Sequence, residues 1–211
     1  MKNIIVLVSG GGTNLQALIN AQEQGEIKNG KITCVISSNP EAYALERAKK
    51  HGIRSEILNR KEYPDNQAYT KDLLKLLEAE KADLIVLAGF MIILDKTLIQ
   101  AYENKIINVH PSLIPSFCGD GFYGLHVHEK ALEKGVKLTG ATVHFVNEIC
   151  DGGAIILQKA VEIQDGDTPP VLQKRVMEQA EWKILPQAVS LFCEDRLTVI
   201  GNHAYIDYKG A

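Results

Sequence analysis

The sequence lacks paired cysteines, a long apolar run and an excess of charge of either sign. Its four cysteines are widely spaced, with no Cys-x-x-Cys pair: Cys34, Cys118, Cys150 and Cys193. Such spacing is typical of reduced cytoplasmic thiols and disfavours a disulfide framework or a zinc site. The longest apolar run, residues 84–94, is well short of the roughly 20 residues that cross a bilayer. The 23 basic and 26 acidic residues give a net charge of −3, which disfavours a protein that coats nucleic acid or an anionic membrane.

The N-terminus also lacks a signal-peptide core, because the apolar run at residues 4–8 is short and glycines follow it. No repeat, low-complexity segment or linker interrupts the chain. With 45 % hydrophobic residues among 211, the chain can bury roughly 70 % of its unfolded surface. We therefore predict a cytoplasmic protein in which residues 1–211 form one domain.

In the first half, short apolar runs alternate with longer amphipathic segments. The runs predict strands at residues 4–8, 31–36, 54–58, 84–88 and 105–109. The amphipathic segments predict helices at residues 14–24, 40–51, 65–80 and 95–102. This alternation indicates an α/β fold, with a doubly wound, mostly parallel twisted sheet and helices on both faces.

The second half has a different pattern, which begins with a loop rich in proline and glycine at residues 110–124. Long loops in compact domains are usually functional or mobile. After it we predict a helix at 126–133, an antiparallel strand pair at 141–146 and 154–161, and a long C-terminal helix from 167 toward 191. A hairpin is expected at residues 199–205.

A glycine-rich turn joins the first strand to the first helix. Gly10 and Gly12 match the first two glycines of Gly-x-Gly-x-x-Gly, but Leu15 occupies the third position. No carboxylate follows about twenty residues later to hold a dinucleotide ribose, and no nucleoside-triphosphate loop motif is present. The free N–H groups at a helix N-terminus suit a single phosphate; the alternative is a simple tight turn.

Polar residues at the end of the strand at 105–109 form the second candidate site. Asn108 and His110 are two residues apart, so their side chains point the same way, and ligands of open α/β sheets bind beyond such strand ends. An amide N–H and an imidazole can together stabilise an oxyanion and move a proton. Asp151 would raise the pKa of His110 if the two residues meet, although an Asp followed by two glycines is also an ordinary turn.

Other chemical patterns are weaker. His126 and His128 form a His-x-His with His144 further on, but no further ligand follows at a recognisable spacing, so no metal is expected. Cys118 shares a loop with His110 and is an alternative nucleophile. The sequence has no Gly-x-Ser-x-Gly motif, which argues against a serine hydrolase.

Four segments, in order over nearly the whole chain, carry a family resemblance. They are residues 6–17, 87–91 and 107–115, and 143–146 followed by Asp151-Gly152-Gly153. Together they closely resemble the phosphoribosylglycinamide formyltransferases, folate-dependent enzymes of purine synthesis. Related formyltransferases acting on methionyl-tRNA, and formyltetrahydrofolate hydrolases, look similar around Asn108, whereas the glycine turn resembles the ribonucleotide phosphate site of the first family.

The resemblance implies formyl transfer from 10-formyltetrahydrofolate to the amine of 5'-phosphoribosylglycinamide in IMP synthesis, with no metal and only small-molecule partners. The implied catalytic residues are Asn108, His110 and Asp151. The implied phosphate and ribose contacts are Gly12, Thr13, Asn14 and Glu181. The implied folate contacts are Met91, Ile92, Ile93, Leu94, Asn108 and Asn66.

The same resemblance divides the domain into a phosphate-binding half, residues 1–100, and a catalytic and folate-binding half, residues 101–211. For the oligomeric state, a monomer and a homodimer both stay open. Some members of the family have Arg where this chain has Asn66 and Ile92, and their loop is shorter than residues 116–124, which we expect to form a flap. Two alternatives stay open: a formyltetrahydrofolate hydrolase, which would not need the glycine turn, and a non-catalytic phosphate- or nucleotide-binding module.

Overall fold

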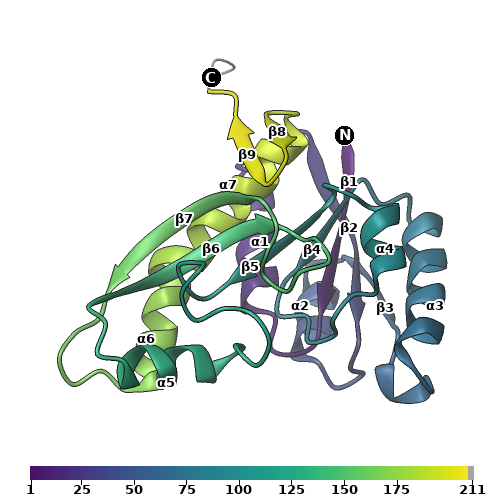
Figure 1. Ribbon diagram of the computed structural model, residues 1–211. Coiled ribbons are helices and arrows are strands. Elements are labelled where there is room, and N and C mark those ends of the chain that lie inside the picture. Colours follow the sequence, from purple (N-terminus) through teal and green to yellow (C-terminus); the bar gives the residue numbers. More distant parts are fainter. Residues whose placement is uncertain (209–211) are drawn as a thin grey trace.

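A single mixed sheet runs through residues 1–208, the part of the chain that the computed structural model describes (Figure 1). Its strands are β1 (Lys2–Val8), β2 (Gly30–Ser37), β3 (Arg54–Ile57), β4 (Leu84–Leu87), β5 (Ile106–His110), β6 (Leu138–Phe145), β7 (Ile155–Glu162), β8 (Leu197–Ile200) and β9 (His203–Ile206). They are ordered β3-β2-β1-β4-β5-β6-β7-β9-β8. Residues 209–211 belong to the C-terminal half that we predict from the sequence, residues 101–211, and lie outside the described residues.

The pairing of the strands confirms the predicted architecture. Strands β1 to β5 are parallel, because β1 pairs with β2 and β4, β2 with β3, and β4 with β5, all in the same direction. Strand β6 is antiparallel to both β5 and β7, and β8 and β9 form the expected hairpin. The chain order reverses between β1 and β4, and open α/β sheets bind ligands beyond the carboxyl ends of the strands at such a point.

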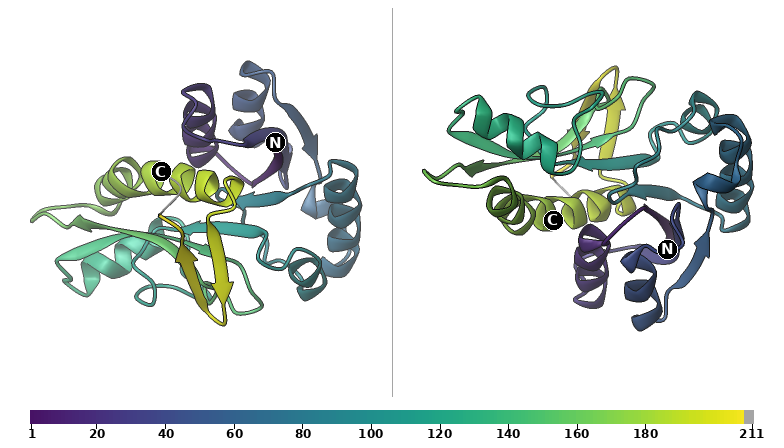
Figure 2. Two further views of the ribbon diagram at one scale, coloured as in Figure 1. Left: turned by 90° about the horizontal axis from the view of Figure 1, so that it is seen from above. Right: turned by 90° about the horizontal axis from the view of Figure 1, so that it is seen from below.

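Helices cover both faces of this sheet, as Figure 2 shows from above and below. They are α1 (Thr13–Glu23), α2 (Tyr43–Lys50), α3 (Asn66–Ala79), α4 (Lys96–Ala101), α5 (Leu125–Glu133), α6 (Pro169–Val176) and α7 (Trp182–Cys193). Short 3-10 and π segments at Arg60–Glu62 and Met177–Glu181 complete the elements. No helix among the described residues is long and apolar enough to cross a membrane.

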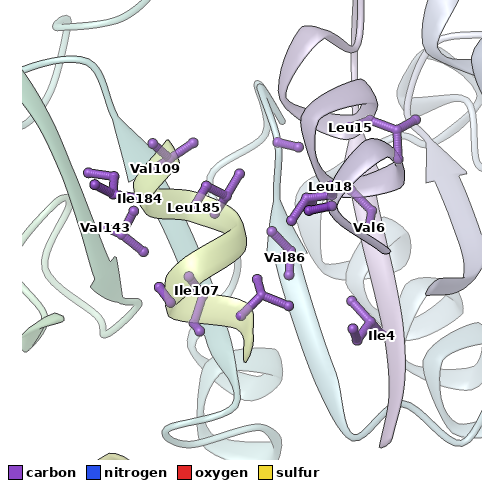
Figure 3. Close-up of a cluster of buried hydrophobic side chains, with 14 of the residues drawn as sticks. Ile4, Val6, Leu15, Leu18, Val86, Ile107, Val109, Val143, Ile184 and Leu185 are labelled. Atoms are coloured by element: carbon purple, nitrogen blue, oxygen red, sulfur yellow. The ribbon is translucent and has the colours of Figure 1, made fainter. Parts of the chain in front are cut away.

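Alternating side chains of the central strands fill two cores. Ile4 and Val6 belong to the core that α1, α2 and α7 cover, whereas Ile5 and Leu7 belong to the core under α3 and α4. Figure 3 shows Leu18 of α1 near Val6 within the first of these cores. Because successive strand residues face opposite sides, the β-branched run of β1 is apolar on both faces and lies in the middle of the sheet.

Two helices differ from their predicted form. Helix α2 starts at Tyr43 rather than residue 40, because a turn at Asn39 comes first: the Asn39 side chain accepts from the Glu41 N–H, and its carbonyl accepts from the Ala42 N–H. The C-terminal helix begins at Pro169, two residues after the predicted start, and the π-helical segment Met177–Glu181 divides it into α6 and α7. Such π segments often mark functional sites.

Candidate functional site

Three loops meet at the carboxyl ends of β1, β4 and β5. The Ser9 N–H donates to the Gly89 carbonyl at 3.2 Å, and the Met91 N–H donates to Ser9 Oγ at 2.9 Å. These bonds hold the glycine turn after β1 beside the segment after β4, at the point where the strand order reverses. Asn108 and His110 lie at the carboxyl end of β5, the next strand of the sheet. The sequence-predicted sites for phosphate, folate and catalysis therefore lie along one edge of the sheet.

The glycine turn leads directly into α1. Gly12 is the N-cap residue, with φ 71° and ψ 33°, and no side chain caps the helix. A Cβ at Gly12 would lie 2.7 Å from the Cβ of Ala44 in α2, and the left-handed φ also favours glycine. Thr13 and Asn14 form the first turn of α1, whose N–H groups have no partner within a helix and attract anions.

The π-helical segment brings two side chains to this turn. Glu181 Oε2 accepts a hydrogen bond from Asn14 Nδ2 at 2.7 Å, and Met177 Sδ accepts one from Thr13 Oγ1 at 3.6 Å. Asn14 and Glu181 are both buried, and Asn14 Oδ1 has no hydrogen-bond partner. The structure thus brings together Gly12, Thr13, Asn14 and Glu181, the four residues expected to hold the ribonucleotide.

Burial sets the protonation of Glu181. It raises the pKa of the carboxyl group from 4.5 to about 7, while the hydrogen bond from Asn14 acts in the opposite direction. A carboxyl group close to half-protonation at neutral pH can either donate to or accept from a hydroxyl group. Glu181 can therefore bind a hydroxyl group of a ligand in either of these two ways.

His110 and Asp151 meet, as the family resemblance implies. His110 Nδ1 lies 3.4 Å from Asp151 Oδ2, and both side chains are largely buried. Asn108 joins them through His144: its Nδ2 lies 3.2 Å from His144 Nε2, which lies 3.6 Å from Asp151 Oδ1. Asn108 and His144 face each other directly across β5 and β6. The polar cluster around His110 therefore contains a second imidazole, which the sequence did not assign to it.

The hydrogen bonds fix the roles of these polar groups. His144 Nδ1 lies 2.8 Å from the Phe145 carbonyl oxygen, to which it can only donate, so in the neutral ring Nε2 accepts from the Asn108 amide. His110 Nε2 donates to the Phe117 carbonyl oxygen at 2.9 Å. Asp151 Oδ2 also accepts from the Gly119 N–H at 2.9 Å. The loop at 116–124 thus contacts both members of the His110–Asp151 pair.

Opposing effects act on the pKa of His110. Burial is the largest and lowers the pKa below its ordinary value, the Asp151 carboxylate and the hydrogen bond to the Phe117 carbonyl raise it, and His144 lowers it. Asp151 therefore acts in the predicted direction, but burial outweighs it. For Asp151 itself, burial raises the pKa, and His144, His110 and the Gly119 amide more than offset this, so its pKa lies below 3.8. The pKa of each of the two groups therefore lies below its ordinary value.

The segment expected to line the folate pocket follows β4. Met91 and Ile93 are exposed, with 56 % and 71 % of their surface accessible, whereas Leu94 is buried. Asn66 at the start of α3 donates from Nδ2 to the Ile93 carbonyl at 3.0 Å. Asn66 therefore supports the backbone of this segment, while the hydrogen bond of Asn108 is made to His144.

The weaker sequence candidates take no part in this arrangement. Cys118 Sγ donates to the Pro115 carbonyl at 3.3 Å, and burial raises the pKa of this thiol, the opposite of what an activated nucleophile needs. His126 is exposed on α5 and pairs with Glu129. His128 is fully buried, and neither ring nitrogen has a hydrogen-bond partner. Within residues 1–208, no group of three or more His, Cys, Asp or Glu side chains is arranged to hold a metal ion.

Comparison with known proteins gives one consistent family. The formyl transferase family model matches residues 2–189. The chain is 43 % identical to phosphoribosylglycinamide formyltransferase of Haemophilus influenzae over 99 % of this chain and 95 % of that protein. It is 39 % identical to the Escherichia coli protein of the same name, over 97 % and 93 %. The crystal structure of glycinamide ribonucleotide transformylase 1 from Symbiobacterium toebii superposes with a TM-score of 0.92 at 41 % identity, covering 98 % of this chain and 94 % of that one.

Proposed function

The chain belongs to the formyl transferase family, and we propose that it transfers the formyl group of 10-formyltetrahydrofolate to the amine of 5'-phosphoribosylglycinamide. The location of two sites on one edge of the sheet is the main structural support for this function. The glycine turn with Asn14 and Glu181 suits a ribonucleotide. The Asn108, His110 and Asp151 set, next along the sheet, suits acyl transfer.

The acyl-transfer chemistry follows from the donors that face this edge. The substrate amine attacks the formyl carbon, and the carbonyl oxygen becomes an oxyanion. The Asn108 amide and, once His110 is protonated, its Nε2–H are the donors that stabilise it. His144 accepts from one N–H of Asn108, which orients the amide and leaves its second N–H for the oxyanion.

Proton movement is the second part of the mechanism. The attacking nitrogen gains a positive charge and must lose a proton, while the folate nitrogen must gain one before its bond to the formyl carbon breaks. For this step the ring proton of neutral His110 lies on Nδ1, toward the Asp151 carboxylate at 3.4 Å, so that Nε2 accepts the first proton and the carboxylate stabilises the imidazolium that forms. The imidazolium then protonates the folate nitrogen, so that formylated product and tetrahydrofolate leave with atoms and charge balanced.

The substrate sites complete the proposal. Gly12, Thr13 and Asn14 bind the phosphate and Glu181 the ribose, while residues 91–94, Asn66 and Asn108 bind the folate. We assign phosphate binding mainly to residues 1–100 and catalysis and folate binding mainly to residues 101–211, with Glu181 reaching across to Asn14. The enzyme acts in the cytoplasm on small molecules only, without a metal, as a monomer or homodimer.

One assay separates this function from its alternatives. The purified protein is mixed with 10-formyltetrahydrofolate, with and without phosphoribosylglycinamide, and tetrahydrofolate release is followed. Release that depends on the ribonucleotide supports formyl transfer. Release without it indicates a formyltetrahydrofolate hydrolase, and no release in either case indicates a binding module.

A matched pair of histidine variants tests the catalytic assignment. His110→Ala should lower kcat by at least about 100-fold, the usual scale of general acid–base catalysis, with little change in ribonucleotide binding. His126→Ala removes an exposed histidine of α5 and should retain wild-type turnover. A His110→Ala enzyme with near wild-type kcat contradicts the mechanism.

A further inference from the structure

We propose that Arg47 is a positioning residue that turns the peptide groups of the glycine turn toward the substrate phosphate. The inference rests on the function proposed above and adds a residue from α2, which the sequence does not connect with the site. Arg47 is part of α2, which packs beside the glycine turn, and its side chain donates a hydrogen bond to one carbonyl group of the turn.

Three contacts fix the Arg47 guanidinium. Its Nε donates to the Gly11 carbonyl oxygen at 2.8 Å, and its Nη1 donates to Gln16 Oε1 at 3.1 Å. The ring of Tyr43 lies against it, with the centroid 5.1 Å from Cζ. A planar fork held at two donors and one face has little freedom. Arg47 therefore fixes the position of the Gly11 carbonyl rather than forming a mobile surface charge.

The geometry of the peptide bond carries this effect to the other side of the turn. In a trans peptide the C=O and the following N–H point in opposite directions. Because Arg47 holds the Gly11 carbonyl toward α2, the Gly12 N–H points away from α2. The Gly10 carbonyl is held in the same way, since it accepts from the Ala44 N–H of α2 at 3.1 Å, so the Gly11 N–H also points away.

The two N–H groups oriented in this way are free. Neither the Gly11 nor the Gly12 N–H donates a hydrogen bond to any described residue. Successive N–H groups that face one side form a concave anion site, continuous here with the first turn of α1. Two hydrogen bonds from helix α2 therefore orient the Gly10–Gly11 and Gly11–Gly12 peptide groups. Within residues 1–208, Arg47 is the only side chain of α2 that donates to the turn.

No other side chain among the described residues donates to a carbonyl group of Gly10, Gly11 or Gly12. A Cβ at Gly12 would lie 2.7 Å from the Ala44 Cβ and 3.4 Å from the Arg47 Cδ. No side chain caps α1 at Gly12. Without the Arg47 bond, the Gly11 carbonyl has no hydrogen-bond donor among the described residues, so the direction of the Gly12 N–H toward the phosphate is less well fixed.

The test compares three variants on α2. Arg47→Met removes the donors and the charge, Arg47→Lys keeps the charge but not the planar fork, and Lys50→Met removes an exposed charge from the end of the same helix. Arg47→Met should raise the KM for phosphoribosylglycinamide about tenfold, the scale of one hydrogen bond to a charged group. Its kcat and its KM for 10-formyltetrahydrofolate should stay within about twofold. Lys50→Met should behave as wild type.

Arg47→Lys separates orientation from charge. We expect its KM for the ribonucleotide to rise at least about fivefold, because one ammonium group cannot hold both Gly11 and Gln16 as the fork does. A wild-type KM in Arg47→Lys would overturn the proposal, since charge alone would then explain the effect. Thermal unfolding of each variant checks folding, and Arg47→Lys remains informative if Arg47→Met does not fold.

A substrate without phosphate separates this inference from the proposed function. Wild-type enzyme should have a higher kcat/KM for phosphoribosylglycinamide than for ribosylglycinamide, and Arg47→Met should lose most of this preference. If the wild type shows no preference, the phosphate assignment of the glycine turn is wrong. If the wild type prefers the phosphate and Arg47→Met keeps the full preference, only the role of Arg47 is wrong.

Discussion

Replacing Asp151 with Asn tests the charge pairing at the centre of the proposed mechanism. The substitution keeps the shape of the side chain and a carbonyl oxygen for the Gly119 N–H, but removes the charge beside His110. The carboxylate favours the imidazolium. Its loss should therefore lower the pKa of His110 further below the already depressed wild-type value.

The distance between the two groups sets the magnitude. Unit charges 3.4 Å apart attract by about 5 kcal/mol at an effective dielectric constant of about 20. This is an upper limit, because both groups have also lost water. A carboxylate neighbour usually changes a pKa by about 1 to 3, and each pKa step corresponds to about 1.4 kcal/mol. We expect the pKa of His110 to fall by about 1 to 3 in Asp151→Asn.

The assay is a titration of the His110 ring by NMR, combined with the pH dependence of kcat. If neutral His110 is the reactive form, activity rises with pH through its pKa, so Asp151→Asn should move this rise to lower pH while lowering the plateau. Other groups near His110 are His144 on β6 and His128 on α5, and both are unchanged in the variant. Asp120→Asn removes an exposed charge from the loop at residues 116–124 and serves as the control. An unchanged or raised pKa of His110 in Asp151→Asn would refute the pairing.

Three further predictions concern the substrate sites. Gly12→Ala should destabilise the fold by about 1–3 kcal/mol, because the new Cβ would lie 2.7 Å from a Cβ of α2 at φ 71°, whereas Gly10→Ala meets nothing within 4 Å; equal urea midpoints would contradict this. Glu181 has a raised pKa in the folded protein, so its contribution to the free energy of unfolding is fully present below pH 4.5 and is lost as pH rises toward about 7. Glu181→Gln should not show this loss, which is on the order of 3 kcal/mol. Urea unfolding of both proteins at pH 5 and pH 8 measures the difference. Asn66→Ala should raise the KM for 10-formyltetrahydrofolate several-fold, because the hydrogen bond to the Ile93 carbonyl is lost; an effect confined to the ribonucleotide KM would count against it.

The sequence predicts best where local periodicity decides the structure. The apolar run of β1 and the alternation with helices give the parallel sheet, and the two-residue spacing of Asn108 and His110 places them on one face of β5. His144 could not be assigned in this way. Its position opposite Asn108 depends on the register of β5 and β6, and a shift of one residue would turn it to the other face of the sheet.

Backbone groups and long-range contacts account for the other residues that the sequence did not reveal. The Phe117 carbonyl reaches His110 from a residue with φ 50°, a conformation that nothing in the sequence signals for Phe. Arg47 belongs to a short helix with several charged residues, a pattern typical of a solvated face. Its contact with Gly11 is 36 positions away in sequence. The π segment brings Met177 and Glu181 to the first turn of α1. No local pattern in the sequence indicates where this segment lies.

The two ring nitrogens of His110 connect the loop to the chemistry. Nδ1 faces the Asp151 carboxylate and Nε2 donates to the Phe117 carbonyl, so both nitrogens are directed at acceptors. A single N–H cannot serve two acceptors at full strength, so an oxyanion that takes the Nε2–H must displace the Phe117 carbonyl. An oxyanion is the stronger acceptor because hydrogen bonds to charged groups are about twice as strong as neutral ones. The mechanism proposed above therefore requires residue 117 to move when the tetrahedral intermediate forms, and the Gly119 N–H, two residues later, ties that movement to Asp151.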